Sequence, residues 1–194
     1  LSPAPLYHAA PLRFCMRCIA EGGTALVMKK FEAQRALELI EQFRVTHSQW
    51  VPTMFVRMLD LPEHVRKSFD LSSMQVALHA AAPCPKDVKL KMMEWWGPII
   101  WEYYSGSERN GATAISPEEW MSHQGSVGRA VSGELRIVAE DGSLCPPRKE
   151  GVVYFANGPK FEYHNDPEET AGAYNEEGWS TIGDIGYLDE EGFL

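Results

Sequence analysis

Short apolar runs and amphipathic stretches alternate along the first half of the chain. Apolar residues recur at helical spacing over residues 33–43 and 53–61, and Pro85 and Gly97 bracket a third helical stretch. Extended apolar runs at residues 24–28, 45–51, 74–80 and 99–103 predict strands between these helices. This order of strand, helix and strand is typical of helices that pack on a largely parallel sheet.

The pattern changes after about residue 111. Helical spacing disappears, and alternating runs at residues 133–138, 152–155 and 179–188 are separated by turn sequences such as Asp141-Gly142. We therefore predict an α/β fold, with a mostly parallel sheet and flanking helices, followed by an antiparallel, barrel-like β subdomain. The predicted subdomains are residues 1–120 and 121–194. Because no Met opens the chain and residues 192–194 end within a predicted hairpin, we expect a fragment of a longer protein.

Composition and charge exclude several classes of protein. The chain has 194 residues, of which 44% are hydrophobic, and a net charge of −9. That composition supports a globular core. Residues 102–194 contain 6 basic and 18 acidic side chains, which argues against a nucleic-acid partner. The apolar runs are too short to span a membrane, and no secretory signal opens the chain.

The cysteines favour a reducing compartment. Four of them stand at irregular spacing, and no second cysteine pair or His-x-His set would complete a metal site with Cys15 and Cys18. We predict reduced thiols in a cytoplasmic protein.

One stretch, residues 102–111, combines several side chains that could bind a ligand. It begins at the carboxyl end of a predicted strand, where ligands bind in open α/β sheets. The Glu108 carboxylate is a hard ligand suited to Mg²⁺, the Ser107 hydroxyl suits a phosphate, and Tyr103 or Tyr104 offers a flat face for a base. A small-residue loop with a purely structural role explains the same residues, so both interpretations are open at this point.

Two other stretches are open to the same pair of interpretations. The three alanines at residues 80–82 leave room for a planar ring against the backbone, or they serve close packing of a helix on a strand. Asp184, between two glycines, suits two vicinal ribose hydroxyls, or it shapes a turn. The carboxylate pairs at 118–119, 168–169 and 176–177 lie in polar, turn-like sequence, and we expect them to be solvated.

Four segments, in this order, resemble the adenylate-forming superfamily, which contains acyl-CoA synthetases, luciferases and the adenylation domains of peptide synthetases. They are Pro5-Leu6-Tyr7-His8, residues 79–83, Tyr104-Ser105-Gly106-Ser107-Glu108 and residues 178–186. The chain departs from the family pattern where Ala80 and Ala81 replace Gly-Gly, Ser105 replaces Gly and Ile182 replaces Thr. None of these departures removes a charge, so we expect them to adjust the fit of a ligand.

The resemblance implies a role for individual residues. Ser107 and Glu108 would be catalytic, with Ser107 bonding the α-phosphate or the carboxylate and Glu108 holding Mg²⁺. Asp184 would bind the ribose hydroxyls, and His8 would lie at the acyl pocket. Tyr103 with Ala81 and Ala82 would enclose adenine. The implied ATP and AMP site comprises Ala81, Ala82, Pro83, Glu102, Tyr103, Tyr104, Ser105, Gly106, Ser107 and Asp184.

The resemblance also implies an activity for the parent protein, which would adenylate a fatty acid with ATP and Mg²⁺ and transfer the acyl group to coenzyme A. A fatty acid is favoured because no carboxylate near His8 would pair with an amino group, and because the Glu-Tyr-Tyr form of the loop resembles bacterial fatty-acyl-CoA synthetases. The fragment would lack the family's phosphate loop and its lysine, so we expect it to be inactive. We also expect it to self-associate, because excision should expose apolar faces that the rest of the parent protein covers. The alternatives are a ligase for an aryl or carnitine-like acid and a noncatalytic nucleotide-binding module.

Overall fold

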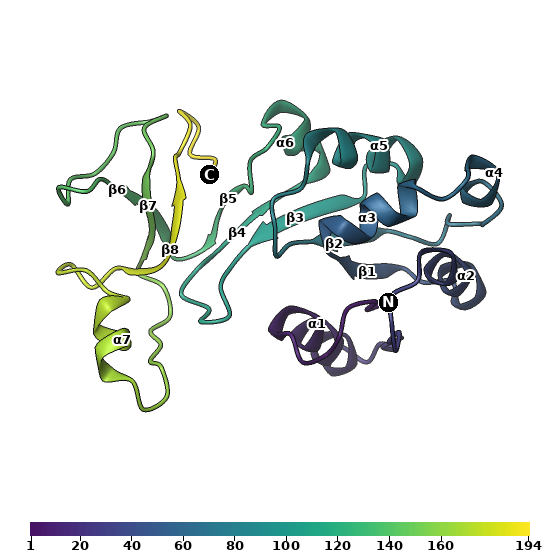
Figure 1. Ribbon diagram of the computed structural model, residues 1–194, viewed down its shortest axis with the longest axis horizontal. Coiled ribbons are helices and arrows are strands. Elements are labelled where there is room, and N and C mark those ends of the chain that lie inside the picture. Colours follow the sequence, from purple (N-terminus) through teal and green to yellow (C-terminus); the bar gives the residue numbers. More distant parts are fainter. The chain divides into compact units, whose positions relative to one another are not determined.

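The computed structural model describes residues 1–194, and the chain divides into two compact units (Figure 1). The first unit comprises Leu1–Glu102 and Ser116–Gly125, and the second comprises Tyr103–Ile115 and Ser126–Leu194.

The first unit is built on parallel strands. They are β1 (His47–Trp50), β2 (Val76–His79) and β3 (Ile100–Tyr104), and β2 lies between the other two. Trp50 pairs with His79, and His79 in turn pairs with Glu102. The carboxyl ends of these strands therefore lie at one edge of the sheet, as the strand–helix–strand order predicts.

Six helices belong to the first unit. Pro52 occupies the first turn of α3, and α5 ends at Gly97, whose φ of +82° favours glycine. α3 and α5 pack side by side (Figure 1). A core of large apolar side chains, including Trp50, Phe55 and Met92, joins these helices to the strands. The helices are α1 (Ala9–Ala20), α2 (Ala33–Phe43), α3 (Pro52–Leu59), α4 (Glu63–Arg66), α5 (Lys86–Trp96) and α6 (Pro117–Ser122).

The second unit is mainly antiparallel. β4 (Ala112–Ile115) pairs with β5 (Arg129–Ser132), and a three-stranded sheet is formed by β6 (Glu134–Val138), β7 (Gly151–Ala156) and β8 (Ser180–Gly186), with β7 in the centre. One short helix, α7 (Pro167–Gly172), precedes β8. Leu135, Ile137, Val153 and Phe155 are the buried core of this sheet.

The predicted fold class, a parallel sheet with helices followed by an antiparallel sheet, is confirmed. One local prediction is wrong. Residues 24–28 form no strand, because Val27 makes only an isolated bridge with Ser2 and no ladder follows. The carboxylate pairs at 118–119, 168–169 and 176–177 are exposed, as predicted. Those at 118–119 and 168–169 occupy the first turns of α6 and α7, where negative charge favours the helix N-terminus.

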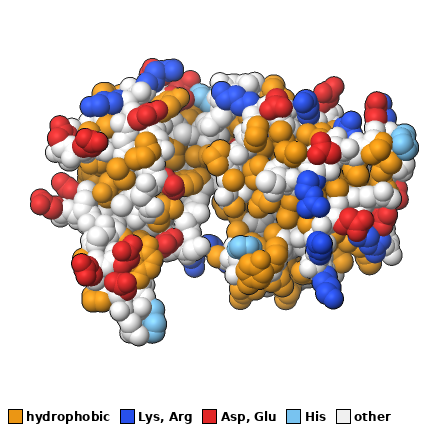
Figure 2. Space-filling model, viewed as in Figure 1, with side chains coloured by type: hydrophobic (Ala, Val, Ile, Leu, Met, Phe, Trp, Pro, Cys, Tyr) orange, Lys and Arg blue, Asp and Glu red, His pale blue; other side chains and the backbone are white.

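The surface of α1 is apolar on its exposed side. Leu12, Met16 and Ile19 are all exposed, and hydrophobic side chains gather over this helix in the lower centre of Figure 2. That surface is compatible with the predicted self-association, which stays a prediction. None of the helices has the length and apolar character that crossing a membrane requires.

Candidate functional site

The loop that follows β3 is closed by hydrogen bonds of its own. The Ser105 hydroxyl donates to the Gly111 carbonyl oxygen at 2.7 Å, and the Arg109 amide donates to the Gly106 carbonyl oxygen at 3.2 Å. Arg109 has a φ of +60°, in the left-handed region. Ser105 stands at the position where the resemblance implies glycine, and its hydrogen bond to Gly111 closes the base of the loop.

Tyr104, the last residue of β3, holds the carboxylate of Asp184. The Tyr104 hydroxyl donates to Asp184 Oδ2 at 2.8 Å, although 80 residues separate them in the chain. Burial and this hydrogen bond raise the pKa of Tyr104, so the phenol stays protonated and remains a donor. Asp184 itself is exposed near the end of β8. The arrangement presents an oriented carboxylate to solvent, with a second oxygen, Oδ1, available to accept further hydrogen bonds.

A second tyrosine holds the carboxylate of Glu108. The Tyr163 hydroxyl donates to Glu108 Oε1 at 3.0 Å, and partial burial together with this bond raises the pKa of Tyr163. The chain contains no group of three or more side chains that would together ligate a metal. Mg²⁺ is usually held by one or two carboxylates together with substrate phosphates, so Glu108 alone is compatible with the predicted magnesium.

Other predicted residues of the loop lie close to these carboxylates. The Ile182 side chain and the Glu108 carboxylate both lie close to the position that a Cβ atom at Gly106 would occupy, so a side chain there would displace them. Ser107 is exposed and Tyr103 is half-buried. The second unit thus brings together Tyr104, Gly106, Glu108 and Asp184, four of the residues predicted from sequence.

The remaining predicted nucleotide residues belong to the first unit. Ala81, Ala82 and Pro83 are exposed in the turn that follows β2. Ala81 has a φ of +76°, which is uncommon for a residue with a side chain and costs about 1 kcal/mol or more relative to glycine. This is the position where the resemblance implies glycine, and strained backbone of this kind is found mostly at functional turns.

Glu102 lies deeper than the sequence analysis implies. It is 5% exposed, and its Oε2 atom accepts a hydrogen bond from Lys89 Nζ at 2.7 Å. Sequence reasoning missed both Lys89 and Tyr163. The signal for Lys89 is its spacing, since it lies three residues before Met92 on the buried side of α5.

His8 directly precedes α1 and is exposed, with its ring packed against Tyr7 at a centroid distance of 4.4 Å. Its assignment to an acyl pocket stays a prediction.

The chain is similar to a known family and to several known proteins. The sequence profile of the family described as AMP-binding enzyme matches residues 1–160. A 4-coumarate-CoA ligase of Narcissus pseudonarcissus is 32% identical over 96% of this chain and 36% of its own length. Two solved structures are similar over the whole chain. An amide bond synthetase from Marinactinospora thermotolerans has a TM-score of 0.87 at 27% identity over 40% of its chain. An o-succinylbenzoate coenzyme A synthetase from Bacillus subtilis, in complex with AMP, has a TM-score of 0.84 at 27% identity over 39% of its chain.

These matches define an α/β enzyme fold of the adenylate-forming type. The chain belongs to the AMP-binding enzyme family. It spans about a third of the length of the curated relatives that it matches.

Proposed function

We propose that the protein containing this chain is an acid–thiol ligase, which activates a carboxylic acid with ATP as an acyl-adenylate and then transfers the acyl group to coenzyme A. The observation that supports this most strongly is the hydrogen bond between Tyr104 and Asp184. It joins the last residue of β3 to β8, and both segments resemble motifs of the family. The relatives whose names include CoA ligase support the same reaction class.

The proposed chemistry assigns a task to each carboxylate. Joining a carboxylate anion to the α-phosphate of ATP requires positive charge and fixed geometry. Mg²⁺, when bound, would supply charge next to the phosphates, and Glu108 would hold it. Tyr163 fixes Glu108 through the hydrogen bond to Oε1. Asp184 would accept the ribose hydroxyls, Ser107 would bond the α-phosphate or the acid, and Tyr103 would offer a flat face to adenine.

The acid is proposed to lack an amino group. A fatty acid is favoured by the absence of a carboxylate in the segment around His8, because a buried ammonium group would need such a partner. An aryl acid is the second candidate, favoured by relatives named for 4-coumarate and o-succinylbenzoate. Pyrophosphate exchange by the full-length protein tests both, with medium- and long-chain fatty acids and hydroxycinnamic acids in one panel. Exchange with neither class would refute the proposal.

Asp184→Ala should weaken AMP binding by the full-length protein. If the carboxylate accepts the ribose hydroxyls, its removal costs charge-assisted hydrogen bonds worth roughly 1.5–3 kcal/mol. The dissociation constant for AMP should therefore rise about 10- to 150-fold. Calorimetric titration and thermal melting on the same preparation measure affinity and stability together.

The matched control is Asp141→Ala. Asp141 is an exposed turn residue of the same unit, and its Oδ1 accepts bonds from the amide and hydroxyl of Ser143. This variant should lower the melting temperature and leave AMP affinity unchanged. If Asp184→Ala likewise lowers the melting temperature and leaves AMP affinity unchanged, Asp184 shapes a turn and does not bind the nucleotide.

A further inference from the structure

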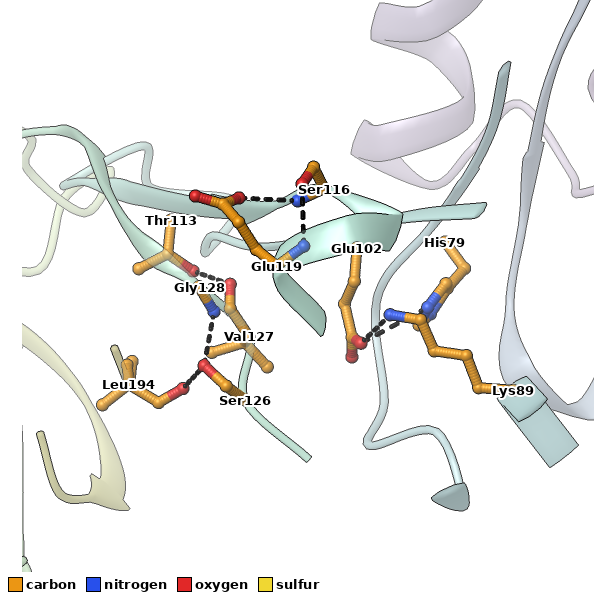
Figure 3. Close-up of polar contacts among 10 residues, drawn as sticks. All are labelled: His79, Lys89, Glu102, Thr113, Ser116, Glu119, Ser126, Val127, Gly128 and Leu194. Carbon is orange, nitrogen blue, oxygen red and sulfur yellow. Dashed lines mark hydrogen bonds and ion pairs between the residues drawn. The ribbon is translucent and has the colours of Figure 1, made fainter. Parts of the chain in front are cut away.

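A second polar cluster lies inside the first unit, apart from the candidate carboxylates of the second unit. It consists of His79, Lys89 and Glu102, which are 0%, 0% and 5% exposed (Figure 3). Lys89 Nζ lies 2.7 Å from Glu102 Oε2, and His79 Nε2 lies 3.4 Å from the same oxygen. Neither ring nitrogen of His79 makes a hydrogen bond, so the cluster is essentially one ion pair with a histidine beside it.

Aromatic side chains enclose this ion pair. Lys89 Nζ lies over the Trp120 ring at 4.6 Å from its centroid, and the His79 ring meets Phe55 edge-on at 5.5 Å. Burial raises the pKa of Glu102 and lowers the pKa of Lys89, while the charge of each partner opposes the shift of the other. Burying two ions costs more than burying apolar side chains of the same size, so this pair is not explained by stability alone.

Two residues of the cluster directly precede, along the chain, segments of the candidate site. His79 is the last residue of β2 and is followed by the turn at residues 80–83. Glu102 pairs with His79 across the sheet and is followed directly by Tyr103 and the loop. Lys89 extends from α5 to Glu102, so its ammonium group links this helix to β3.

We propose that Lys89 is a positioning residue for nucleotide binding. This role rests on the proposed function. It assigns to the Lys89–Glu102 pair the task of fixing the carboxyl-terminal half of β3, and with it Tyr103 and Tyr104, the last two residues before the loop. In this role Glu102 is held by Lys89 and does not contact the nucleotide. The ion pair supplies a polar contact that apolar side chains do not, because Lys89 Nζ holds Glu102 Oε2 at 2.7 Å.

The test separates positioning from stability by removing both charges together. In the full-length protein, Lys89→Met combined with Glu102→Met leaves no unpaired buried ion, and replacements of this kind are often neutral or stabilising. We expect the double variant to melt at or above the temperature of the parent, and its dissociation constant for AMP to rise roughly tenfold or more. The single variant Lys89→Met, which leaves Glu102 unpaired, should lose both stability and affinity.

The matched control is the exposed ion pair of the same helix, in which Lys91 Nζ lies 3.5 Å from Asp87 Oδ2. Lys91→Met combined with Asp87→Met should leave the AMP dissociation constant within about twofold of the parent. A Lys89/Glu102 double variant that binds AMP as tightly as the parent overturns the positioning role. A double variant that fails to fold also overturns it, because the pair then serves the fold itself. A parent protein that binds no AMP refutes the proposed function, and the positioning role falls with it.

Discussion

Gly128→Ala should destabilise the protein by about 3 kcal/mol or more, since two penalties add at this position. Gly128 has a φ of +98°, and a Cβ atom there would overlap the carbonyl group of Ala114 in the neighbouring strand. The surroundings are also fixed, because Ser126 Oγ accepts from the Gly128 amide at 2.9 Å and donates to the Leu194 carbonyl oxygen at 2.6 Å (Figure 3). The β4–β5 pairing would have to separate to admit the methyl group.

Gly142→Ala is the matched control for this prediction. Gly142 has a φ of +81°, but no atom lies within 4 Å of the Cβ that it would gain. This variant should cost only about 1 kcal/mol, for the backbone conformation alone. Urea denaturation of both variants measures the difference. Equal losses in the two would mean that the close approach at Gly128 does not limit stability.

The helices and strands that the sequence located correctly are those whose signals are local. Pro85 and Gly97 bracket α5 in the sequence and in the structure, because a proline suits a helix start and a glycine with positive φ suits its end. The strand predicted at residues 74–80 is observed as Val76–His79. Its ends differ because pairing with β1 and β3, rather than local composition, determines where a strand ends.

The short helices α6 and α7 were not predicted, although the sequence contains a capping signal for each of them. Ser116 and Glu119 form a capping box at the start of α6, and the Asp166 side chain accepts from the Glu169 amide at the start of α7. In both cases a cap residue is followed by Pro-Glu-Glu. Helices of six residues have too few positions to show apolar periodicity, so only the caps identify them.

The candidate site was predictable as a set of segments but not as a set of contacts. Motif order located the loop around Glu108 and the segment around Asp184. The partners of these carboxylates, Tyr163 and Tyr104, lie 55 and 80 residues away along the chain. Such contacts depend on how β3 and β8 are placed within the fold, which no local pattern specifies.

Acid should destabilise the protein through His79 as the pH falls below 6.5. Burial, reinforced by the nearby charge of Lys89, lowers the pKa of His79 from its usual 6.5 to about 3. The unfolded chain therefore binds this proton more tightly than the folded protein does. Stability from this group is fully present above pH 6.5 and is lost as the pH falls from 6.5 towards 3.

The expected loss is large for a single side chain. At about 1.4 kcal/mol per pH unit, the contribution of His79 should fall by about 2–3 kcal/mol between pH 6.5 and pH 4.5. Carboxylates titrate over part of the same range, so the effect must be isolated by substitution. His79→Leu removes the titrating ring. It breaks no hydrogen bond, because neither ring nitrogen of His79 makes one.

The difference between parent and variant is therefore the quantity to measure. Urea midpoints at pH 7, 6.5, 5.5 and 4.5 should show His79→Leu losing about 2–3 kcal/mol less than the parent over this range. His64→Gln, which removes an exposed imidazole from α4, controls for the loss of a histidine and should follow the parent. If His79→Leu follows the parent as well, the buried imidazole accepts its proton as readily in the folded protein as in the unfolded chain, and the cluster with Lys89 and Glu102 is open to water.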